Sequence, residues 1–575
     1  MGIHTFLRPA SWLLCVALGA AACSNSDQNG APPGSVGPDG GESTPGADAG
    51  ADASGPVTPT VSSWLGTNVA ADLPRVDVTY QLNPFDTAAA QKDANGYPMP
   101  GVNGSSSTDI GFVLPSGVYK ISYQGTGQLG VSGIGKLMGS WQTVGNEQRA
   151  EVQITGTPGA FGNFLTLTIT NAAGQSVTNI HLYLPGFDYD TKQVFTPQLL
   201  ALLTPFRALR FMEWMNTNGS TLANWSDRPS AASFGSSPFG QPYEHIVELV
   251  NETGKDAWIN IPEHATDDFV HQLGQFLAAG LDLDRINAAR AAAGESGPFQ
   301  LLVENSNETW NGGFTAYKTF LAAANANPTR YTGTYSGSYG PSWMTGSSDL
   351  MKVGQYEADR LVQIATILRQ ELGANASLVQ PVLAGWALGA GYSDDGLMFI
   401  KANYGEPSKY VSYVASAPYF GPADDTSTGA LDTLFTAVDT NVQSMDATFG
   451  DFAKLVQQYG LQMSAYEGGQ GLSGATNQTI KHLAQHDVRM HDAYVSYFAL
   501  WKKHFGSSLF MHFDLAGSPG LPENIYQYGY WGSIIGVMED TSTCGTSLPT
   551  LTGTEMISSV VHHCPKYQAL KEQVP

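Results

Sequence analysis

Two rhythms of hydrophobic residues divide the chain. Between about residues 76 and 185, apolar and polar residues alternate, as in Leu165-Thr166-Leu167-Thr168-Ile169, and Gly-rich turns separate the short runs. A period of two places one side chain in a core and the next in solvent, as in a half-buried strand. Several short strands of this kind predict an antiparallel β-sandwich over residues 76–185.

From about residue 196, short continuous apolar runs alternate with helical patterns. Apolar residues recur every three to five positions from Val353 to Leu372, and Asp267-Asp268 is expected to cap a helix that reaches about Ala279. Alternation of strands and helices predicts a parallel sheet. The seven apolar runs are 208–212, 257–261, 299–303, 379–383, 410–415, 461–466 and 508–513.

An eighth strand is expected at 64–69, in front of the sandwich. We therefore predict an α/β fold, a (β/α)8 TIM barrel with the lateral β-sandwich inserted after the first barrel strand. The expected segments are the first barrel strand within 61–75, the sandwich at 76–185, the barrel at 186–540 and a C-terminal tail at 541–575. A doubly wound open sheet is the alternative architecture.

The first residues have the pattern of a targeting signal. His4 and Arg8 precede the apolar run 12–18, which is shorter than the roughly 20 residues of a membrane-spanning helix, and small residues lead to Cys23. This pattern resembles the lipobox of bacterial lipoproteins, although Ala20 stands where Leu is usual. The resemblance implies a signal peptide at 1–22, a lipid anchor on Cys23 and a place in the cell envelope, at the outer membrane or cell surface. An ordinary signal peptide cut near Ala22 is the alternative.

Residues 23–60 are rich in Gly, Pro, Ala, Ser and Asp and contain neither Lys nor Arg. They lack the apolar residues that form a core, so we expect a disordered tether. Further along, Cys544 and Cys564 are expected to form a disulfide in an oxidising compartment. A metal site that combines Cys564 with His562 and His563 is the alternative.

The charge and composition of the chain indicate which classes of molecule it can bind. The chain has 27 Lys and Arg against 50 Asp and Glu, a formal net charge of −23. Such a charge repels phosphate, so nucleic acid and anionic lipid surfaces are poor partners, and membrane attachment is expected through a lipid anchor alone. Charged residues make up only 13% of the chain, about half the usual share, whereas aromatic residues reach 11%. A neutral, aromatic-rich surface suits a carbohydrate substrate.

In a (β/α)8 barrel the chemistry lies at the C-terminal ends of the strands. Counting 64–69 as the first strand, the fourth strand ends in Glu304-Asn305-Ser306-Asn307-Glu308-Thr309-Trp310-Asn311, and the seventh strand is followed by Glu467. Two carboxyl groups that face each other across a sugar fit glycoside hydrolysis, because one can donate a proton while the other stays ionised. Glu304 is the rival of Glu308 for the acid role. The alternative for Glu308 and Glu467 is two solvated loop carboxylates.

Asn307-Glu308 and Glu467, at the ends of strands four and seven, resemble the catalytic signature of clan A glycoside hydrolases. The chain is also similar to a group of secreted bacterial proteins with a lateral β-domain, often labelled cellulose-binding. The resemblance implies a retaining hydrolase of β-linked polysaccharides or oligosaccharides, with a substrate similar to cellulose or β-glucan. It also implies that the enzyme needs no cofactor and no metal. It assigns Glu308 as the acid/base and Glu467 as the nucleophile. Substrate-binding roles are implied for Arg210, His264, Asn307, Tyr419, Trp310 and Trp531, the last because strand eight ends in His512-Phe513-Asp514 without the clan's Trp.

Several alternatives stay open. Arg210 could instead be a buried salt-bridge partner, and His264 and Tyr419 could be packing residues. A carbohydrate-binding protein without turnover and a transglycosylase are the rival functions, and the sugar, the mode of attack and the oligomeric state are undetermined. The Gly-rich segment 125–130 lies in an all-β region and is rejected as a dinucleotide site, and His482 with His486 is expected to be a solvated helix face.

Overall fold

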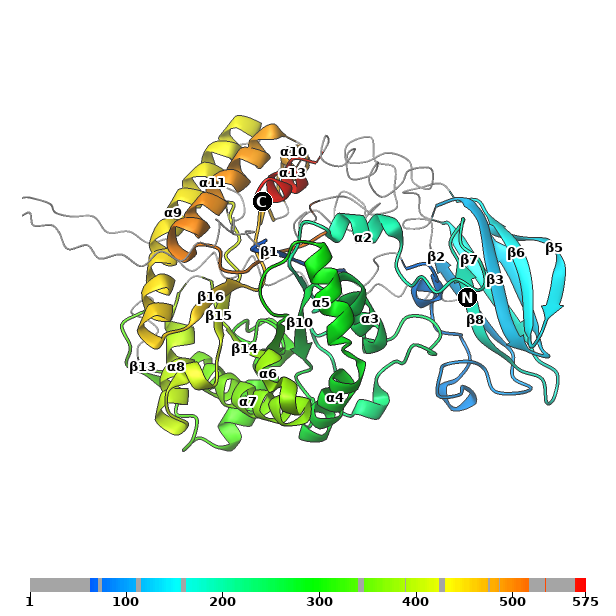
Figure 1. Ribbon diagram of the computed structural model, residues 1–575, viewed down its shortest axis with the longest axis horizontal. Coiled ribbons are helices and arrows are strands. Elements are labelled where there is room, and N and C mark those ends of the chain that lie inside the picture. Colours follow the sequence, from blue (N-terminus) through cyan, green and yellow to red (C-terminus); the bar gives the residue numbers. More distant parts are fainter. Residues whose placement is uncertain are drawn as a thin grey trace, which may run out of the picture.

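The computed structural model describes residues 63–70, 75–109, 115–156, 162–339, 346–387, 389–422, 430–473, 476–485, 487–516, 533 and 564–574. Eight parallel strands close into a barrel in the order β1-β17-β16-β15-β14-β11-β10-β9, in which β9 pairs with β1 (Figure 1). This closure confirms the predicted barrel and excludes the open sheet. The strands are β1 (Leu65–Asn68), β9 (Ala208–Arg210), β10 (Asp256–Ile261), β11 (Leu301–Asn305), β14 (Val379–Ala384), β15 (Tyr413–Ser416), β16 (Gln462–Ala465) and β17 (Phe510–His512).

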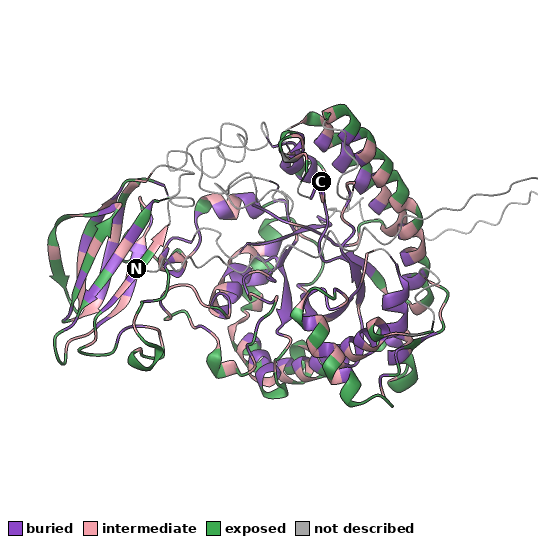
Figure 2. Ribbon diagram, turned by 180° about the vertical axis from the view of Figure 1, so that it is seen from behind, coloured by how far each residue is buried: buried purple, intermediate pink, exposed green. Residues whose placement is uncertain are grey.

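The barrel strands are buried on both faces, which explains their continuous apolar runs (Figure 2). One face fills the barrel interior with side chains such as Trp258, Leu302 and Tyr466. Glycine suits position 66, because a Cβ atom there would lie 2.9 Å from the backbone oxygen of Ala208 and would also displace the Met511 side chain. The other face packs against helices.

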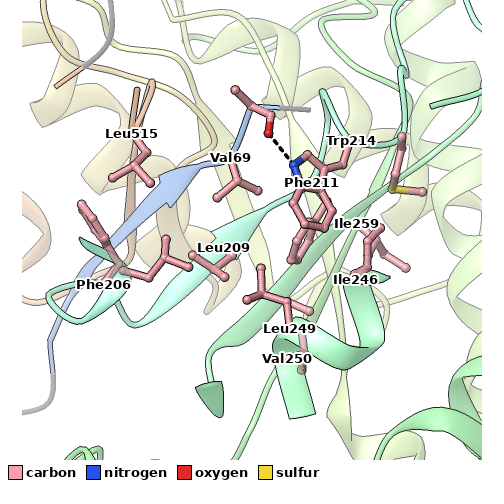
Figure 3. Close-up of a cluster of buried hydrophobic side chains, with 14 of the residues drawn as sticks. Val69, Phe206, Leu209, Phe211, Trp214, Ile246, Leu249, Val250, Ile259 and Leu515 are labelled. Atoms are coloured by element: carbon pink, nitrogen blue, oxygen red, sulfur yellow. Dashed lines mark hydrogen bonds between the residues drawn. The ribbon is translucent and has the colours of Figure 1, made fainter. Parts of the chain in front are cut away.

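Figure 3 shows one part of this outer packing, where β1, β9 and β10 meet helix α3 (Tyr243–Thr253). Leu209 and Ile259 pack with Leu249 of α3, and the indole of Trp214 donates a hydrogen bond to the carbonyl of Ala70. This packing holds the C-terminal ends of the first three barrel strands in place. Those ends carry several of the polar side chains of the candidate site.

The helices connect the barrel strands and surround them (Figure 1). Helix α4 begins at Asp267, as expected, but its cap is Thr266, whose hydroxyl accepts from the amide of Phe269 at 3.1 Å. The prediction that Asp267-Asp268 forms the cap is therefore wrong by one residue. The other helices are α2 (Pro197–Leu203), α4 (Asp267–Gly280), α5 (Leu283–Ala292), α6 (Thr315–Ala326), α7 (Asp349–Leu372), α8 (Gly391–Asn403), α9 (Leu431–Tyr459), α10 (Gln478–Ala484), α11 (Val488–Phe505) and α13 (Pro565–Lys571), and the short strands β12 (Thr334–Tyr335) and β13 (Gly346–Ser347) pair with each other.

The predicted sandwich follows β1 and stands beside the barrel (Figure 1). It consists of two antiparallel sheets, β2-β7-β4 and β5-β6-β3-β8, and the alternating residues Leu165, Leu167 and Ile169 are buried as expected. The segment 125–130 turns from β3 into β4, which agrees with its rejection as a dinucleotide site. The strands are β2 (Gly104–Asp109), β3 (Gly117–Gly125), β4 (Gln128–Gly133), β5 (Gly135–Val144), β6 (Glu147–Ile154), β7 (Phe164–Thr170) and β8 (Val177–Tyr183).

An aromatic contact joins the sandwich side to the barrel side. Phe85 stacks on Phe234 with ring centroids 4.4 Å apart, and Tyr97 lies 5.5 Å from the same ring. The buried guanidinium of Arg75 donates to Gln241, just before α3. These contacts are buried, so the two units pack as parts of one body.

Several predictions concern residues outside the described part. These are the signal peptide, Cys23, the tether 23–60, Trp531, Cys544, His562 and His563, together with His486 and the side chain of His482. Cys564 is described and buried, and its pairing with Cys544 stays a prediction. Among the described residues, no helix combines the length and apolar character needed to cross a bilayer.

Candidate active site

A buried arginine joins the strands that carry the two predicted catalytic glutamates. Arg210, at the end of β9, has no exposed surface. Its Nε donates to Glu304 Oε2 at 3.0 Å, its Nη1 to Glu467 Oε1 at 2.8 Å, and its Nη2 to Asn307 Oδ1 at 2.7 Å. Asn68 Oδ1, at the end of β1, accepts from Nη1 at 2.9 Å. We call these residues the Arg210 network.

Glu467 follows β16 and is only 5% exposed. One carboxylate oxygen accepts from Arg210, and Oε2 accepts from the hydroxyl of Tyr419 at 2.9 Å. Hydrogen bonds on both oxygens fix the orientation of the carboxylate, and the guanidinium supplies an opposite charge. This environment suits an ionised carboxylate that acts as a nucleophile.

Glu308 has a different environment. Its Oε2 accepts from the amide of Asn311 at 3.0 Å, and the residue is 8% exposed. Burial is the main cause that raises the pKa of Glu308 to about 8, and the negative charge of Glu467 raises it further. Both effects favour the protonated form of Glu308. Two nearby carboxyl groups with different environments can have well-separated pKa values, which allows one to be protonated while the other is ionised.

The loop that carries Glu308 has a strained backbone. Ser306 and Glu308 adopt left-handed conformations, with φ of 62° and 43°. The amide of Ser306 donates to the carbonyl of Ile261, and the carbonyl of Ser306 accepts from Asn260, both at 2.8 Å. Such conformations persist only where surrounding bonds impose them, and they often occur at functional sites.

Glu304 lies within β11 and has no exposed surface. Arg210 contacts both of its carboxylate oxygens at 3.0 Å, and the indole of Trp258 donates to Oε2 at 2.8 Å. Burial raises the pKa of Glu304, whereas the charge of Arg210 lowers it. A carboxylate without exposed surface is poorly placed to protonate a substrate, so the geometry favours Glu308 over Glu304 as the acid.

Aromatic side chains surround the two glutamates. The indole of Trp310 donates to the hydroxyl of Tyr466 at 3.0 Å, and its ring centroid lies 6.0 Å from that of Trp386. Phe513 follows β17 directly, and its ring packs edge-on against that of Tyr419, with the ring centroids 6.3 Å apart. Phe513 thus follows strand eight, at the place where the resemblance of the sequence to clan A enzymes led us to expect Trp. The predicted substitute, Trp531, lies outside the described residues.

The structure does not place His264 in the Arg210 network. Its side chain is 42% exposed, and its Nε2 lies 3.4 Å from Glu263 Oε1. Its substrate-binding role stays a prediction. Conversely, the sequence prediction missed Asn68 and Asn311, and of these Asn68 could have been found because it ends a barrel strand. Within the described residues, no group of three or more His, Cys, Asp or Glu side chains could hold a metal ion.

Comparison with known proteins finds only weak structural likenesses. No family model and no curated protein matches the chain. Similar solved structures include a xylanase from Clostridium thermocellum with CBM22-1 and GH10 modules, complexed with xylohexaose (11% identity, TM-score 0.37, covering 88% of this chain and 98% of that one). Others are a GH51 arabinofuranosidase from Xanthomonas axonopodis pv. citri (14%, 0.34, 58% and 63%) and a GH5-4 broad specificity endoglucanase from Ruminococcus champanellensis with bound cellotriose (11%, 0.33, 67% and 87%).

The chain therefore spans less than two thirds of the length of that arabinofuranosidase. All three likenesses have low identity and TM-scores below 0.4, and none of them carries an argument about activity.

Proposed function

We propose that the chain is a retaining glycoside hydrolase that acts on β-linked polysaccharides or oligosaccharides of the cellulose or β-glucan kind. The observation that carries this proposal is the pair of unlike glutamates. Glu467 is held by Arg210 and Tyr419, whereas Glu308 is buried without a cationic partner of its own among the described residues, and burial raises its pKa. Glycoside hydrolysis by two carboxyl groups needs one of each kind, and the retaining outcome is proposed from the resemblance of the sequence to clan A enzymes.

The reaction has two steps. Glu467 attacks the anomeric carbon while Glu308 gives its proton to the departing glycosidic oxygen, so the sugar becomes bound to Glu467 and the leaving group departs as an alcohol. Glu308, now ionised, takes a proton from water, and the resulting hydroxide displaces Glu467 from the same carbon. Two inversions restore the starting configuration, and the net change is the addition of one water molecule.

The aromatic residues support a carbohydrate substrate. Trp310 and Trp386 are partly exposed and lie on the loops after β11 and β14, next to the acid/base loop. Aromatic faces pack well against the apolar faces of sugar rings. We further propose that Cys23 carries a lipid that holds the enzyme at the cell envelope, a proposal supported by the sequence pattern alone.

The proposal is tested by a product screen followed by two variants. The wild-type protein is incubated with β-glucans, mannans, xylans and galactans, and Glu467→Ala is expected to abolish all turnover. Glu308→Ala should lose about 10²- to 10⁴-fold on natural substrates, because proton transfer contributes that much. Glu263→Gln changes a carboxylate that bonds Thr315 and Thr319 outside the Arg210 network, and it should stay active.

Azide then separates the two roles. In Glu308→Ala, azide replaces the activated water and should give a glycosyl azide with the starting anomeric configuration. In Glu467→Ala, azide enters from the opposite face and should give the other anomer. Full activity of both variants would contradict the catalytic roles of the two glutamates. A wild-type protein that binds a glycan but cleaves none would instead favour carbohydrate binding without turnover. Interchanged products would mean that the two glutamates have exchanged roles.

A further inference from the structure

Behind the loop that carries Glu308 lies a buried group of three polar side chains. Glu357 of α7 accepts on Oε2 from the hydroxyl of Thr309 and, at 2.7 Å, from the hydroxyl of Tyr392 of α8. The Thr309 and Tyr392 oxygens are 3.2 Å apart. We call Thr309, Glu357 and Tyr392 the latch. It ties the residue after Glu308 to two helices of the outer layer.

The latch is sealed from solvent, since each of its three residues is 1% exposed. Burial raises the pKa of Glu357 to about 8, which favours the neutral carboxyl group, and its Oε2 accepts from both hydroxyls. Buried polar groups that lose a partner are costly, because water cannot replace it. The three groups therefore hold one another in a single arrangement.

Helix α7 leaves room for this arrangement. Gly354 lies three residues before Glu357, on the same side of the helix. A Cβ atom at Gly354 would lie 3.1 Å from the ring of Tyr392. The glycine thus lets the tyrosine ring approach the helix closely enough to reach Glu357.

The position of the latch matters because Glu308 has a left-handed backbone, with φ of 43°. A glutamate relaxes from this conformation unless the chain is held on both sides. On the N-terminal side, Ser306 is bonded to Ile261 and Asn260. On the C-terminal side, Thr309 is bonded to Glu357 and lies within hydrogen-bond distance of Tyr392.

We propose that Glu357 and Tyr392 are positioning residues that act through Thr309 to hold Glu308 in place for proton transfer. This inference rests on the proposed glycosidase function. It concerns residues that do not contact substrate, and it assigns a task to a buried acid that the two-step reaction leaves unused. Displacement of a catalytic group by about 1 Å can cost about 100-fold in rate.

The test compares Thr309→Val, which keeps the shape but removes the hydroxyl, with Thr309→Ser, which keeps the hydroxyl. The kcat/KM of each is measured on two aryl glycosides of the sugar found in the product screen. The first has a poor leaving group whose departure needs protonation. The second is a dinitrophenyl glycoside, whose dinitrophenolate departs without protonation. Thr309→Val and Tyr392→Phe should lose about 10- to 100-fold on the first and less than about 3-fold on the second. Thr309→Ser keeps the hydroxyl and Glu357→Gln keeps an oxygen that accepts from it. Both single variants should therefore retain most of the wild-type kcat/KM on both substrates.

A matched control separates positioning from general damage to the fold. Asp359 is another buried carboxylate of α7, two residues beyond Glu357, and it bonds Arg330 and Tyr331 away from the Arg210 network. Asp359→Asn disturbs the helix layer to a similar extent. If it lowers activity, it should lower kcat/KM on both aryl glycosides by the same factor. Equal losses on both substrates in Thr309→Val would overturn the positioning role.

Amide hydrogen exchange tests the latch without any turnover. In Thr309→Val, amides of the segment 305–311 should exchange at least about tenfold faster than in the wild type, whereas β10 and β14 keep their protection. Unchanged exchange in this segment would overturn the inference. If the wild type cleaves no glycoside but exchange responds as expected, the latch stands as a loop anchor and the proposed function fails instead.

Discussion

The chemical state of Glu308 depends on the charges of its neighbours. After burial, the largest cause of its raised pKa is the negative charge of Glu467, and the charge of Glu304 acts in the same direction. Arg210 opposes both. Glu304 therefore influences the acid without touching the substrate. It also shares the guanidinium that binds the nucleophile.

Replacing Glu304 by Gln should move the pH profile of the enzyme. In the wild type, kcat/KM is expected to fall as pH rises through about 8, because Glu308 then loses the proton that it must donate. Glu304→Gln removes one negative charge, so the pKa of Glu308 should drop and the decline should begin at lower pH. Hydrolysis of an aryl glycoside with a poor leaving group, measured from about pH 5 to 10, checks this. A decline at the same or a higher pH would contradict the electrostatic role of Glu304, and Glu263→Gln serves as the control.

At this scale the sequence predicts the groups that end barrel strands. Glu308, Asn307, Glu467 and Arg210 all lie at or just after such ends, and the fold brings them together. Glu357 could not be predicted in the same way. It lies in a helix 49 residues after Glu308, and only the packing of α7 on the barrel brings it to Thr309.

At the scale of elements, each apolar run corresponds to a barrel strand, yet the boundaries differ. The run 299–303 predicts the fourth strand, whereas β11 extends from Leu301 to Asn305. The pattern stops at Val303 because Glu304 reads as polar and exposed. Its burial is made possible by Trp258 of the adjacent strand β10 and by Arg210 of β9, one strand further along the barrel. A window of sequence contains no information about such partners.

The start of α4 gives a test of a corrected boundary. Thr266→Ala should lower the free energy of unfolding by about 1 kcal/mol, because the amide of Phe269 loses its side-chain acceptor. Asp268→Asn, in the first turn, should change it by less than about 0.5 kcal/mol, as is usual for exposed positions. Urea unfolding followed by circular dichroism measures both. A larger cost for the Asp268 variant would restore the acidic pair as the cap.

At the scale of the whole molecule, an inserted domain must be docked as well as folded. The sequence predicts the insertion. The alternation of apolar and polar residues begins after the first barrel strand and ends before the helical spacing of apolar residues begins. It does not predict the docking. The rings that make the contact, Phe85, Tyr97 and Phe234, lie outside helices and regular strands, where no period marks them as buried.

This contact should make the sandwich and the barrel unfold together. Phe234 is 5% exposed and stacks on Phe85 at 4.4 Å, and loss of a buried Phe side chain typically costs about 3–5 kcal/mol. In Phe234→Ala the sandwich is expected to uncouple, so that calorimetry shows two transitions where the wild type shows one. Phe164→Ala removes a ring that is 50% exposed on β7, and it should leave the single transition in place. Turnover of a small aryl glycoside should change little in either variant, since the Arg210 network lies within the barrel. A single transition at the wild-type temperature in Phe234→Ala would show that other contacts hold the two units together.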